Sequence, residues 1–443
     1  MAVTPHYPRL VRPLLVEALA DTPVVLVHGP RQCGKTTLAR DVGDAAGYAY
    51  RTFDDDTLRA AAEADPVGFV ADLPERAVLD EVQRVPGLFT SLKAAVDRDR
   101  TPGRFLLTGS ANVLLVPHLS DSLAGRMEVL RLHPLSQHEL AGLAGEAPTF
   151  VERLFEGGLP ETTGSAADDA GADDAEADDA EADDAEAGGV RLGRDLAGTV
   201  VAGGYPAALE RASERRRTAW YRAYVETIVQ RDVRDLAAIR NLDALPRLLA
   251  AVASQTSRLL NVTDLAGPFR MTRPTVRDYV TLLSGVFLVD ELPPWHSNRL
   301  SRLVKTAKLH AGDTGVACAL LEVGADELWA DRELYGQMLE TFVYGELVRQ
   351  ASGGARPVAF HHLRDRKGVE VDLVLERSGR ELVGVEVKAS ATVRGKDFHG
   401  LRKLQEAVGD RLVAGVVLYD GGATLPFGDR LWAVPIRRLW DPE

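Results

Sequence analysis

The sequence predicts an α/β protein of several domains, and three observations support this prediction. The first is size, because 443 residues, of which 45% are hydrophobic, suffice for about three domains with separate cores. The second is a glycine-rich turn near residue 30, between an apolar run and a helix-like run. The third is a pair of alternating apolar and polar runs near residue 380, which is typical of a β-hairpin. We expect a parallel sheet first, a helical middle and a smaller α/β domain last.

The glycine-rich turn has the pattern GxxxxGKT. The run Val24–Val27 predicts a buried parallel strand before it, and Thr37–Arg40 suits the start of a helix. In that setting, backbone N–H groups surround phosphate oxygens, and a chance glycine turn is disfavoured. We expect Lys35 to neutralise the phosphates of ATP and Thr36 to bind Mg²⁺. The residues expected to contact the nucleotide are Gly29, Pro30, Arg31, Gln32, Cys33, Gly34, Lys35, Thr36 and Thr37.

Two further apolar runs end in polar residues that suit ATP hydrolysis. One ends in Asp80, expected to hold Mg²⁺ through water, and Glu81, expected to polarise the attacking water. The alternative for this pair is an acidic cap between a strand and a helix. The other run is followed by Ser110, a candidate sensor of the γ-phosphate. Arg126 is a candidate arginine finger in its own or a neighbouring subunit, and the alternative is an ordinary surface arginine.

The negative charge of the chain is concentrated in one segment. Residues 168–187 contain eleven carboxylates and no Lys or Arg, so the formal charge of −13 becomes −2 without them. Within this segment ADDAE occurs three times in tandem, which is a low-complexity pattern with little to bury. We interpret it as a solvated linker, and an acidic mimic of DNA is the alternative. The rest of the chain is nearly neutral and can carry local basic surfaces.

Composition also narrows the class of protein. We find no apolar run of about 18 residues and no secretion signal, so we expect a cytoplasmic protein without a membrane partner. The two cysteines, Cys33 and Cys318, are far apart in sequence, which disfavours a disulfide framework and a cysteine zinc site.

The middle of the chain has the pattern of a winged helix-turn-helix. Thr272 is a suitable N-cap, and Val276, Val280 and Leu283 recur at helical spacing after it. Apolar runs after residue 285 predict the strands of a wing, and no acidic residue occurs from 293 to 312. A module that serves only packing or protein contact is the alternative. The residues expected to face DNA are Arg273, Thr275 and Arg277 on the second helix and Arg299, Arg302, Lys305 and Lys308 on the wing.

The alternating runs Val369–Leu375 and Leu382–Lys388 predict a hairpin centred on Gly379, with Asp372 opposite Glu386. Alternation directs one set of side chains to the core, namely Val371, Leu373, Val385 and Val387, and another to the opposite face, namely Asp372, Glu386 and Lys388. Two opposed carboxylates favour Mg²⁺ between them, and Lys388 would then orient or deprotonate water. Glu340 is expected as a third acid, with Glu346 as a weaker candidate.

Several motifs occur in an order that indicates one family. GPRQCGKTTL, AVLDEVQ, FLLTGSAN and SLAGR resemble the AAA-type ATPases of bacteria and archaea that carry a nuclease-like C-terminal domain, and the resemblance continues through GGYP and QRDV at residues 203–206 and 230–233. The acidic repeat departs from this pattern. The D…ExK constellation of Asp372, Glu386 and Lys388 resembles the PD-(D/E)XK nuclease superfamily, which has a restriction-endonuclease-like α/β fold.

The resemblance and the patterns together predict a P-loop AAA-type ATPase domain (1–140), a lid or connector (141–165), the acidic linker (166–189), a helical connector (190–240), a winged helix-turn-helix (241–315) and a nuclease-like domain (330–443). The expected function is ATP hydrolysis, with ATP and Mg²⁺ as cofactors, coupled to DNA binding and to metal-dependent phosphodiester cleavage. The alternative is an ATP-dependent regulatory or partner-binding switch with an inactive nuclease scaffold. A homo-oligomer is compatible with Arg126 acting on a neighbouring subunit.

Overall fold

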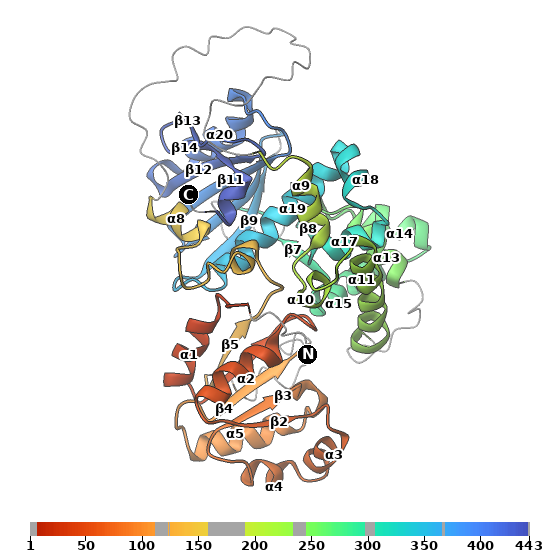
Figure 1. The fold of residues 1–443 in the computed structure, drawn as a ribbon, viewed down its shortest axis with the longest axis vertical. Coiled ribbons are helices and arrows are strands. Elements are labelled where there is room, and N and C mark those ends of the chain that lie inside the picture. The colour runs from red at the N-terminus through yellow and green to blue at the C-terminus, as the bar shows by residue number, and fades with distance from the viewer. Residues whose placement is uncertain are drawn as a thin grey trace.

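The computed structural model describes residues 7–110, 123, 125–157, 191–233, 245–296, 306–365 and 368–441. Figure 1 shows an N-terminal α/β domain below, a mainly helical module (residues 191–330, the middle module) at the upper right, and a C-terminal α/β domain at the upper left. Within these described stretches, no helix is long and apolar enough to cross a membrane.

The N-terminal domain contains the predicted parallel sheet. Its strand order is β2-β3-β4-β1-β5, and every neighbouring pair is parallel. β1, β3 and β4 are buried along their whole length, which explains their continuous apolar sequences. The elements are α1 (Arg12–Asp21), β1 (Val24–His28), α2 (Lys35–Ala45), β2 (Ala49–Thr52), α3 (Asp56–Ala64), α4 (Pro66–Ala71), β3 (Ala77–Asp80), the 3₁₀ turn η1 (Val82–Arg84), α5 (Leu88–Arg98), β4 (Phe105–Gly109), β5 (Met127–Arg131) and α7 (Gln137–Leu140).

In the middle module, helices surround a three-stranded antiparallel sheet of order β6-β8-β7. The predicted cap is confirmed, since the Thr272 hydroxyl accepts from Thr275 N at 3.3 Å, and Val276, Val280 and Leu283 are buried as predicted. The elements are α9 (Arg194–Ala202), α10 (Pro206–Leu209), α11 (Glu214–Ile228), the π-helix η3 (Val229–Val233), α13 (Leu245–Ala253), β6 (Arg258–Leu259), α14 (Val262–Phe269), α15 (Arg273–Gly285), β7 (Val289–Leu292), β8 (Lys308–Ala311), α17 (Thr314–Leu321) and α18 (Ala325–Ala330).

The C-terminal domain has a six-stranded mixed sheet of order β13-β14-β12-β11-β10-β9. β9, β10 and β11 are antiparallel, β11, β12 and β14 are parallel, and β13 is antiparallel to β14. The long helix α19 packs on one face of this sheet and α20 on the other. The elements are α19 (Arg332–Ala351), β9 (Val358–Arg364), β10 (Glu370–Arg377), β11 (Glu381–Lys388), η5 (Gly395–Phe398), α20 (His399–Val408), η6 (Gly409–Arg411), β12 (Leu412–Tyr419), β13 (Leu425–Gly428), β14 (Leu431–Pro435) and η7 (Ile436–Leu439).

The predicted hairpin register is confirmed, because Leu373 lies opposite Val385 and Val374 lies opposite Gly384. The prediction that Val371 shares a face with Leu373 is wrong. The pairing of β10 with β9 shifts between Val371 and Val374, and Val371 packs in the cluster with α20 whereas Leu373 packs in the cluster with α19. A β-bulge breaks the strict alternation of side chains between the two faces. In addition, both faces of the sheet are covered, whereas an isolated hairpin would leave one face open to solvent.

α8 (Phe150–Glu156) packs on the C-terminal sheet although it follows the N-terminal domain in sequence. Its apolar residues belong to the same core as α19, and the Arg153 guanidinium donates to the carbonyl of Arg438 at 2.5 Å. α9 packs into that core as well. Two helices that precede α19 in the sequence, α8 and α9, therefore pack in the core of the C-terminal domain.

Candidate functional site

The phosphate loop has the geometry of an anion site. Gly29 has φ +155°, and a Cβ there would lie 2.0 Å from the Leu132 carbonyl oxygen, so only glycine fits. α2 begins at Lys35, directly after Gly34 at φ +102°. The buried Lys35 ammonium donates to the carbonyls of Gly29 at 3.0 Å and Pro30 at 2.7 Å. A helix N-terminus and an ammonium at one loop fit the phosphates of a nucleotide.

Oxygen atoms suitable for Mg²⁺ lie at the end of β3. The Thr36 hydroxyl donates to Asp80 Oδ1 at 3.0 Å, and the Tyr50 hydroxyl donates to Asp80 Oδ2 at 2.7 Å. Thr108 also donates to Asp80. Burial and the contact with Asp80 raise the pKa of Tyr50, so its hydroxyl stays protonated. This donor set fits a hard cation, which Thr36 and Asp80 would hold beside the phosphates. Tyr50 was not among the predicted site residues.

Two predicted catalytic residues meet beside this acid. Ser110 donates to Glu81 Oε2 at 3.0 Å, and Glu81 has φ +61°, which directs its side chain at the end of β3. The Gln83 amide donates to Ser110 Oγ at 2.8 Å and also to Glu81. Gln83 therefore fixes the position of the Glu81 carboxylate that would polarise water. It was not predicted from the sequence, because glutamine is neither an acid nor a base.

Arg126 is not brought to this site. Its guanidinium pairs with Asp97 on α5, with Nε 2.5 Å from Oδ1, and Arg126 is not among the described residues that line the cavity beside the phosphate loop. The structure therefore gives no support for an arginine finger within the same subunit.

A cavity of about 650 Å³, which we call the nucleotide cavity, lies between the phosphate loop and the middle module. Its second wall includes Pro206 on α10, Trp220 and Tyr224 on α11 and Arg231 on η3. The rings of Trp220 and Tyr224 are stacked, with centroids 5.1 Å apart and planes inclined by 13°, and the Tyr224 hydroxyl donates to the Arg31 carbonyl at 3.3 Å. A flat aromatic wall beside a phosphate loop suits a nucleobase. The motifs GGYP and QRDV supply part of this wall, but spacing alone did not connect them with the phosphate loop.

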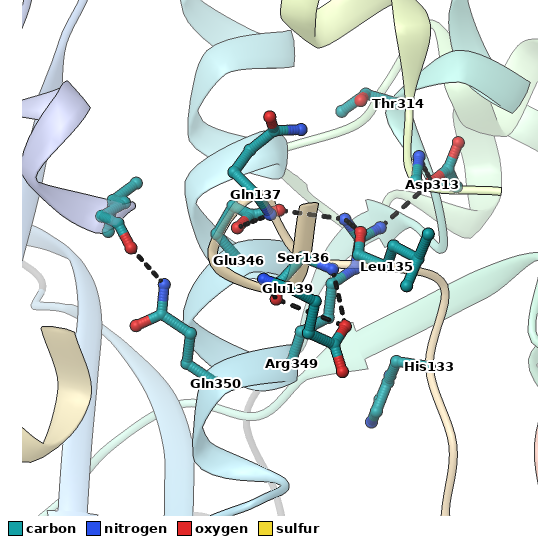
Figure 2. A network of polar contacts seen from close by, with 12 residues as sticks. His133, Leu135, Ser136, Gln137, Glu139, Asp313, Thr314, Glu346, Arg349 and Gln350 are labelled. Carbon is teal, nitrogen blue, oxygen red and sulfur yellow. Dashed lines mark hydrogen bonds and ion pairs between the residues drawn. The ribbon is translucent and has the colours of Figure 1, made fainter. Parts of the chain in front are cut away.

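A buried polar network joins the phosphate loop to the rest of the chain, and Figure 2 shows the part of it between the segment 133–139 and α19. The Arg9 guanidinium donates to the Cys33 carbonyl of the phosphate loop at 2.7 Å and pairs with Glu139 at 3.0 Å. Glu139 in turn accepts from the backbone N–H of Ser136 at 3.0 Å. The segment 133–139 is therefore tied directly to the phosphate loop.

Arg349 on α19 forms the other half of this network. It donates to the Leu135 carbonyl at 3.2 Å and pairs with Asp313 at 3.0 Å and with Glu346 at 3.1 Å. Glu346 accepts from the backbone N–H of Gln137 at 2.8 Å, and burial raises its pKa to about 7 although Arg349 opposes the rise. Glu346 is thus a structural partner of Arg349, and the expectation that it joins the C-terminal acids is wrong.

On α15, the structure brings together three residues predicted to contact DNA. Arg273 and Arg277 are exposed and Thr275 is partly exposed, and Arg277 pairs with Glu291 on β7 at 3.3 Å. Arg299, Arg302 and Lys305 lie outside the described residues. The prediction for Lys308 is wrong, because its side chain is directed inward and the residue is only 2% exposed.

The C-terminal acids come close together but are joined through amines and backbone groups. Asp372 N donates to Glu386 Oε2 at 3.4 Å, Val387 N donates to Asp372 Oδ2 at 3.0 Å, and Lys388 pairs with Glu386 at 2.9 Å. Burial and the neighbouring Asp372 carboxylate raise the pKa of Glu386 to about 8.

Glu340 faces the same acids from α19, with Lys308 between them. The Lys308 ammonium lies 2.6 Å from Glu340 and 3.4 Å from Asp372. No group of three or more His, Cys, Asp or Glu side chains in the described ranges is arranged to hold a metal ion. Carboxylates are suitable ligands, but this arrangement does not fit Mg²⁺ because an ammonium lies between them.

Sequence matches cover most of the chain in three parts. Residues 21–141 match the family model of an AAA domain, and residues 193–327 and 335–439 match two domains of unknown function, DUF8612 and DUF4143. Two uncharacterized proteins, Rv2008c of Mycobacterium tuberculosis and Mb2031c of Mycobacterium bovis, are each 30% identical over 428 residues, which are 96% of this chain and 82% of theirs.

Solved structures are similar at a lower level. The Walker-type ATPase PABY2304 of Pyrococcus abyssi has a TM-score of 0.37 and 15% identity, covering 72% of this chain and 99% of that one. The RuvB Holliday junction branch migration motor of Thermotoga maritima has a TM-score of 0.27 and 15% identity, covering 64% and 89%. The family assignment rests on the sequence matches: the chain belongs to the family of the two mycobacterial proteins, and its N-terminal part is a P-loop ATPase domain of the AAA type.

Proposed function

We propose that this protein is an ATP-dependent switch that acts on DNA, in which the bound nucleotide controls the DNA contact of the middle module. One observation carries this proposal: the nucleotide cavity has the phosphate loop as one wall and α10, α11 and η3 of the middle module as the other. A ligand between two walls stabilises the arrangement in which both touch it, so binding and release would shift how the middle module sits on the ATPase domain.

The order of elements in the middle module supports a winged helix. A helix and a short strand precede α14 and α15, and β7 and β8 follow them as an antiparallel pair. In such a module the second helix of the helix-turn-helix enters the major groove. Arg273, Thr275 and Arg277 lie in the N-terminal half of α15 and supply cationic and polar groups for that contact. Because the wing residues from 297 to 305 are outside the described part, the proposal rests on α15.

ATP turnover is tested by phosphate release from purified wild-type protein and the Lys35→Ala variant. Removing the ammonium takes away a positive charge at the phosphates, so hydrolysis should fall at least about 100-fold. Lys403→Ala, which removes an exposed lysine on α20, should leave the rate unchanged. Equal rates for wild type and Lys35→Ala would contradict hydrolysis at this loop.

DNA binding is tested by fluorescence anisotropy with a labelled duplex in the presence of ATPγS, of ADP and of no nucleotide. We expect affinity to differ between nucleotide states, and Arg273→Ala/Arg277→Ala to weaken binding and reduce the slope of log K against log salt by about 2. Lys396→Ala/Lys403→Ala removes the same charge from exposed positions on the C-terminal domain and is the matched control. Equal losses in both double variants, or identical affinity in all three nucleotide states, would overturn the proposal.

A second candidate is metal-dependent phosphodiester cleavage, which would require the Lys308 ammonium to move away from Glu340 and Asp372. It is favoured by the adjacency of Asp372, Glu386 and Lys388 at the neighbouring ends of β10 and β11. Plasmid and linear DNA would be incubated with Mg²⁺ or Mn²⁺, with and without ATP, using wild type and Asp372→Ala/Lys388→Ala. Cleavage that the double variant loses would support a nuclease, and intact DNA with both proteins would favour the switch without cleavage.

For Arg126, the role of an arginine finger that acts on the nucleotide of a neighbouring subunit in an oligomer stays a proposal.

A further inference from the structure

Lys308 connects the middle module to the acids of the C-terminal domain. It is the first residue of β8, yet its ammonium lies 2.6 Å from Glu340 Oε1, 3.3 Å from Glu370 Oε1 and 3.4 Å from Asp372 Oδ1. These carboxylates come from α19 and β10, which belong to a different domain. One ammonium therefore lies where three carboxylates from two elements converge.

The buried charges of Lys308 and the carboxylates around it are tolerated only because they are paired. Glu340 and Asp372 are each 9% exposed, and several uncompensated carboxylates at such a site would be costly. An ammonium has three N–H donors, and three carboxylates lie within ion-pair distance of it. Burial lowers the pKa of Lys308, but Glu340 and Asp372 raise it by more, so the side chain stays charged.

The position of Lys308 is fixed by further contacts between the two domains. Thr341, the neighbour of Glu340, shares hydrogen bonds with Thr256 Oγ1 at 2.8 Å and with His310 Nδ1 at 3.1 Å. Ser257 donates to Glu340 itself. Contacts on both sides of Lys308 hold β8 and the residues before β6 against α19. They keep the Lys308 ammonium at its buried position, away from solvent.

We propose that Lys308 acts as a built-in cation that replaces a divalent metal ion at the acids Glu340, Glu370 and Asp372 and keeps this site closed to metal in the folded chain. The Lys308 ammonium lies at ion-pair distance from the very carboxylates that a metal would use, so the two cannot be bound together. Opening the site requires β8 to move away from α19. The inference goes beyond the proposed switch and does not depend on DNA binding or ATP turnover.

The test measures Mn²⁺ binding by the loss of the free-ion EPR signal, without nucleotide and at pH 7.5. All proteins are full-length and carry Asp80→Asn, so that the acid beside the phosphate loop does not contribute. In this background Lys308→Met should gain one Mn²⁺ site that the parent lacks, and adding Asp372→Asn should weaken that site at least about tenfold, since a carboxylate ligand is lost. Lys403→Met, which removes an exposed lysine, should gain nothing.

A second readout is thermal stability, because an ion that binds only the folded state raises the midpoint of unfolding. Mn²⁺ should raise the midpoint of Lys308→Met and leave that of the parent unchanged. The proposal is overturned if the parent already binds Mn²⁺ at a site that depends on Asp372, or if folded Lys308→Met binds none. If Lys308→Met does not fold, Lys308→Gln, which keeps a donor to Glu340, enters the same assays with the same two outcomes.

Discussion

Gln83 lies where its side-chain amide can position the proposed catalytic groups of the ATPase domain. Its amide contacts Ser110 and Glu81, and neither Gln83 nor Ser110 is among the described residues that line the nucleotide cavity. Glu81 does line it. If Glu81 polarises the attacking water as proposed, Gln83 would influence hydrolysis through the carboxylate of Glu81.

We expect Gln83→Leu to lower kcat for ATP hydrolysis about tenfold and to leave KM within about twofold, since the ground-state contacts of the nucleotide are kept. Glu81→Gln removes the proposed base and should lower kcat by about 100-fold or more. In the double variant the loss should not exceed that of Glu81→Gln, because both act through one group. Steady-state phosphate release measures all three, and additive losses would contradict the positioning role.

His28, at the end of β1, predicts a dependence of stability on pH. Its ring contacts Phe287 of the middle module edge-on at 5.6 Å, and burial, followed by Arg131 and Lys35, lowers its pKa to about 4. The unfolded chain takes up a proton below the ordinary pKa of about 6.5, whereas the folded chain does so only near 4. The stability that neutral His28 contributes is therefore complete above pH 6.5 and is lost as the pH falls towards 4.

The variant His28→Leu removes this titration. Between pH 7.5 and pH 5 the free energy of unfolding of wild type should fall by about 2 kcal/mol more than that of the variant. Urea titrations at the two pH values measure the difference. An equal decrease in both proteins would show that His28 is not held neutral.

At the scale of elements, one carboxylate serves both as a helix cap and as an ion-pair partner. Asp313 is the N-cap of α17, accepting from Gly315 N at 2.9 Å, and it also accepts from Gly204 N and pairs with Arg349. Asp331 is the N-cap of α19, accepting from Leu334 N at 3.0 Å, and it lies at an exposed position. The two helices thus offer a matched comparison.

Asp313→Ala should destabilise the protein by about 3–5 kcal/mol, because Arg349 loses one of its two buried carboxylate partners as α17 loses its cap. Asp331→Ala removes a cap alone and should cost about 1 kcal/mol. Asp313→Asn keeps most of the cap and should fall between the two. Chemical denaturation gives the three values, and similar costs for both alanine variants would show that the ion pair contributes nothing.

Elements defined by local sequence could be predicted, and contacts between distant elements could not. The cap at Thr272 and the hairpin register depend on residues a few positions apart, and the structure confirms both. Lys308 belongs to a run with the composition of an exposed basic strand, but its partners Glu340 and Asp372 are 32 and 64 residues away. The aromatic wall of Trp220 and Tyr224 was missed for the same reason, since it meets the phosphate loop only after folding.

At the scale of the whole molecule, Arg349 is the point at which the three parts of the chain meet. It contacts Leu135 after the ATPase sheet, Asp313 in the middle module and Glu346 on its own helix. Through Glu139 and Arg9 the same network reaches the phosphate loop. A change at the nucleotide therefore has a continuous path of packed polar contacts to α19.

We expect Arg349→Lys to weaken this coupling while retaining the positive charge. A lysine has no planar fork, so it cannot keep the contacts with Leu135, Asp313 and Glu346 at once. Hydrogen–deuterium exchange of α19 should respond to ATPγS in wild type and respond less in the variant, with ATP hydrolysis within about threefold of wild type, since the loop itself is unchanged. An unchanged response of α19 would show that the coupling takes another path.

The two segments on either side of residues 158–190 are both attached to the C-terminal sheet. α8 precedes that stretch and packs with α19, and after it the backbone N–H groups of Leu192 and Gly193 donate to Asp420, which follows β12, at 3.2 Å. The peptide bonds between 157 and 191 consequently do not set the relative positions of the domains. A protease cut anywhere in that stretch should leave two polypeptides that stay associated, which makes it a natural place to divide the protein into separately expressed and labelled halves.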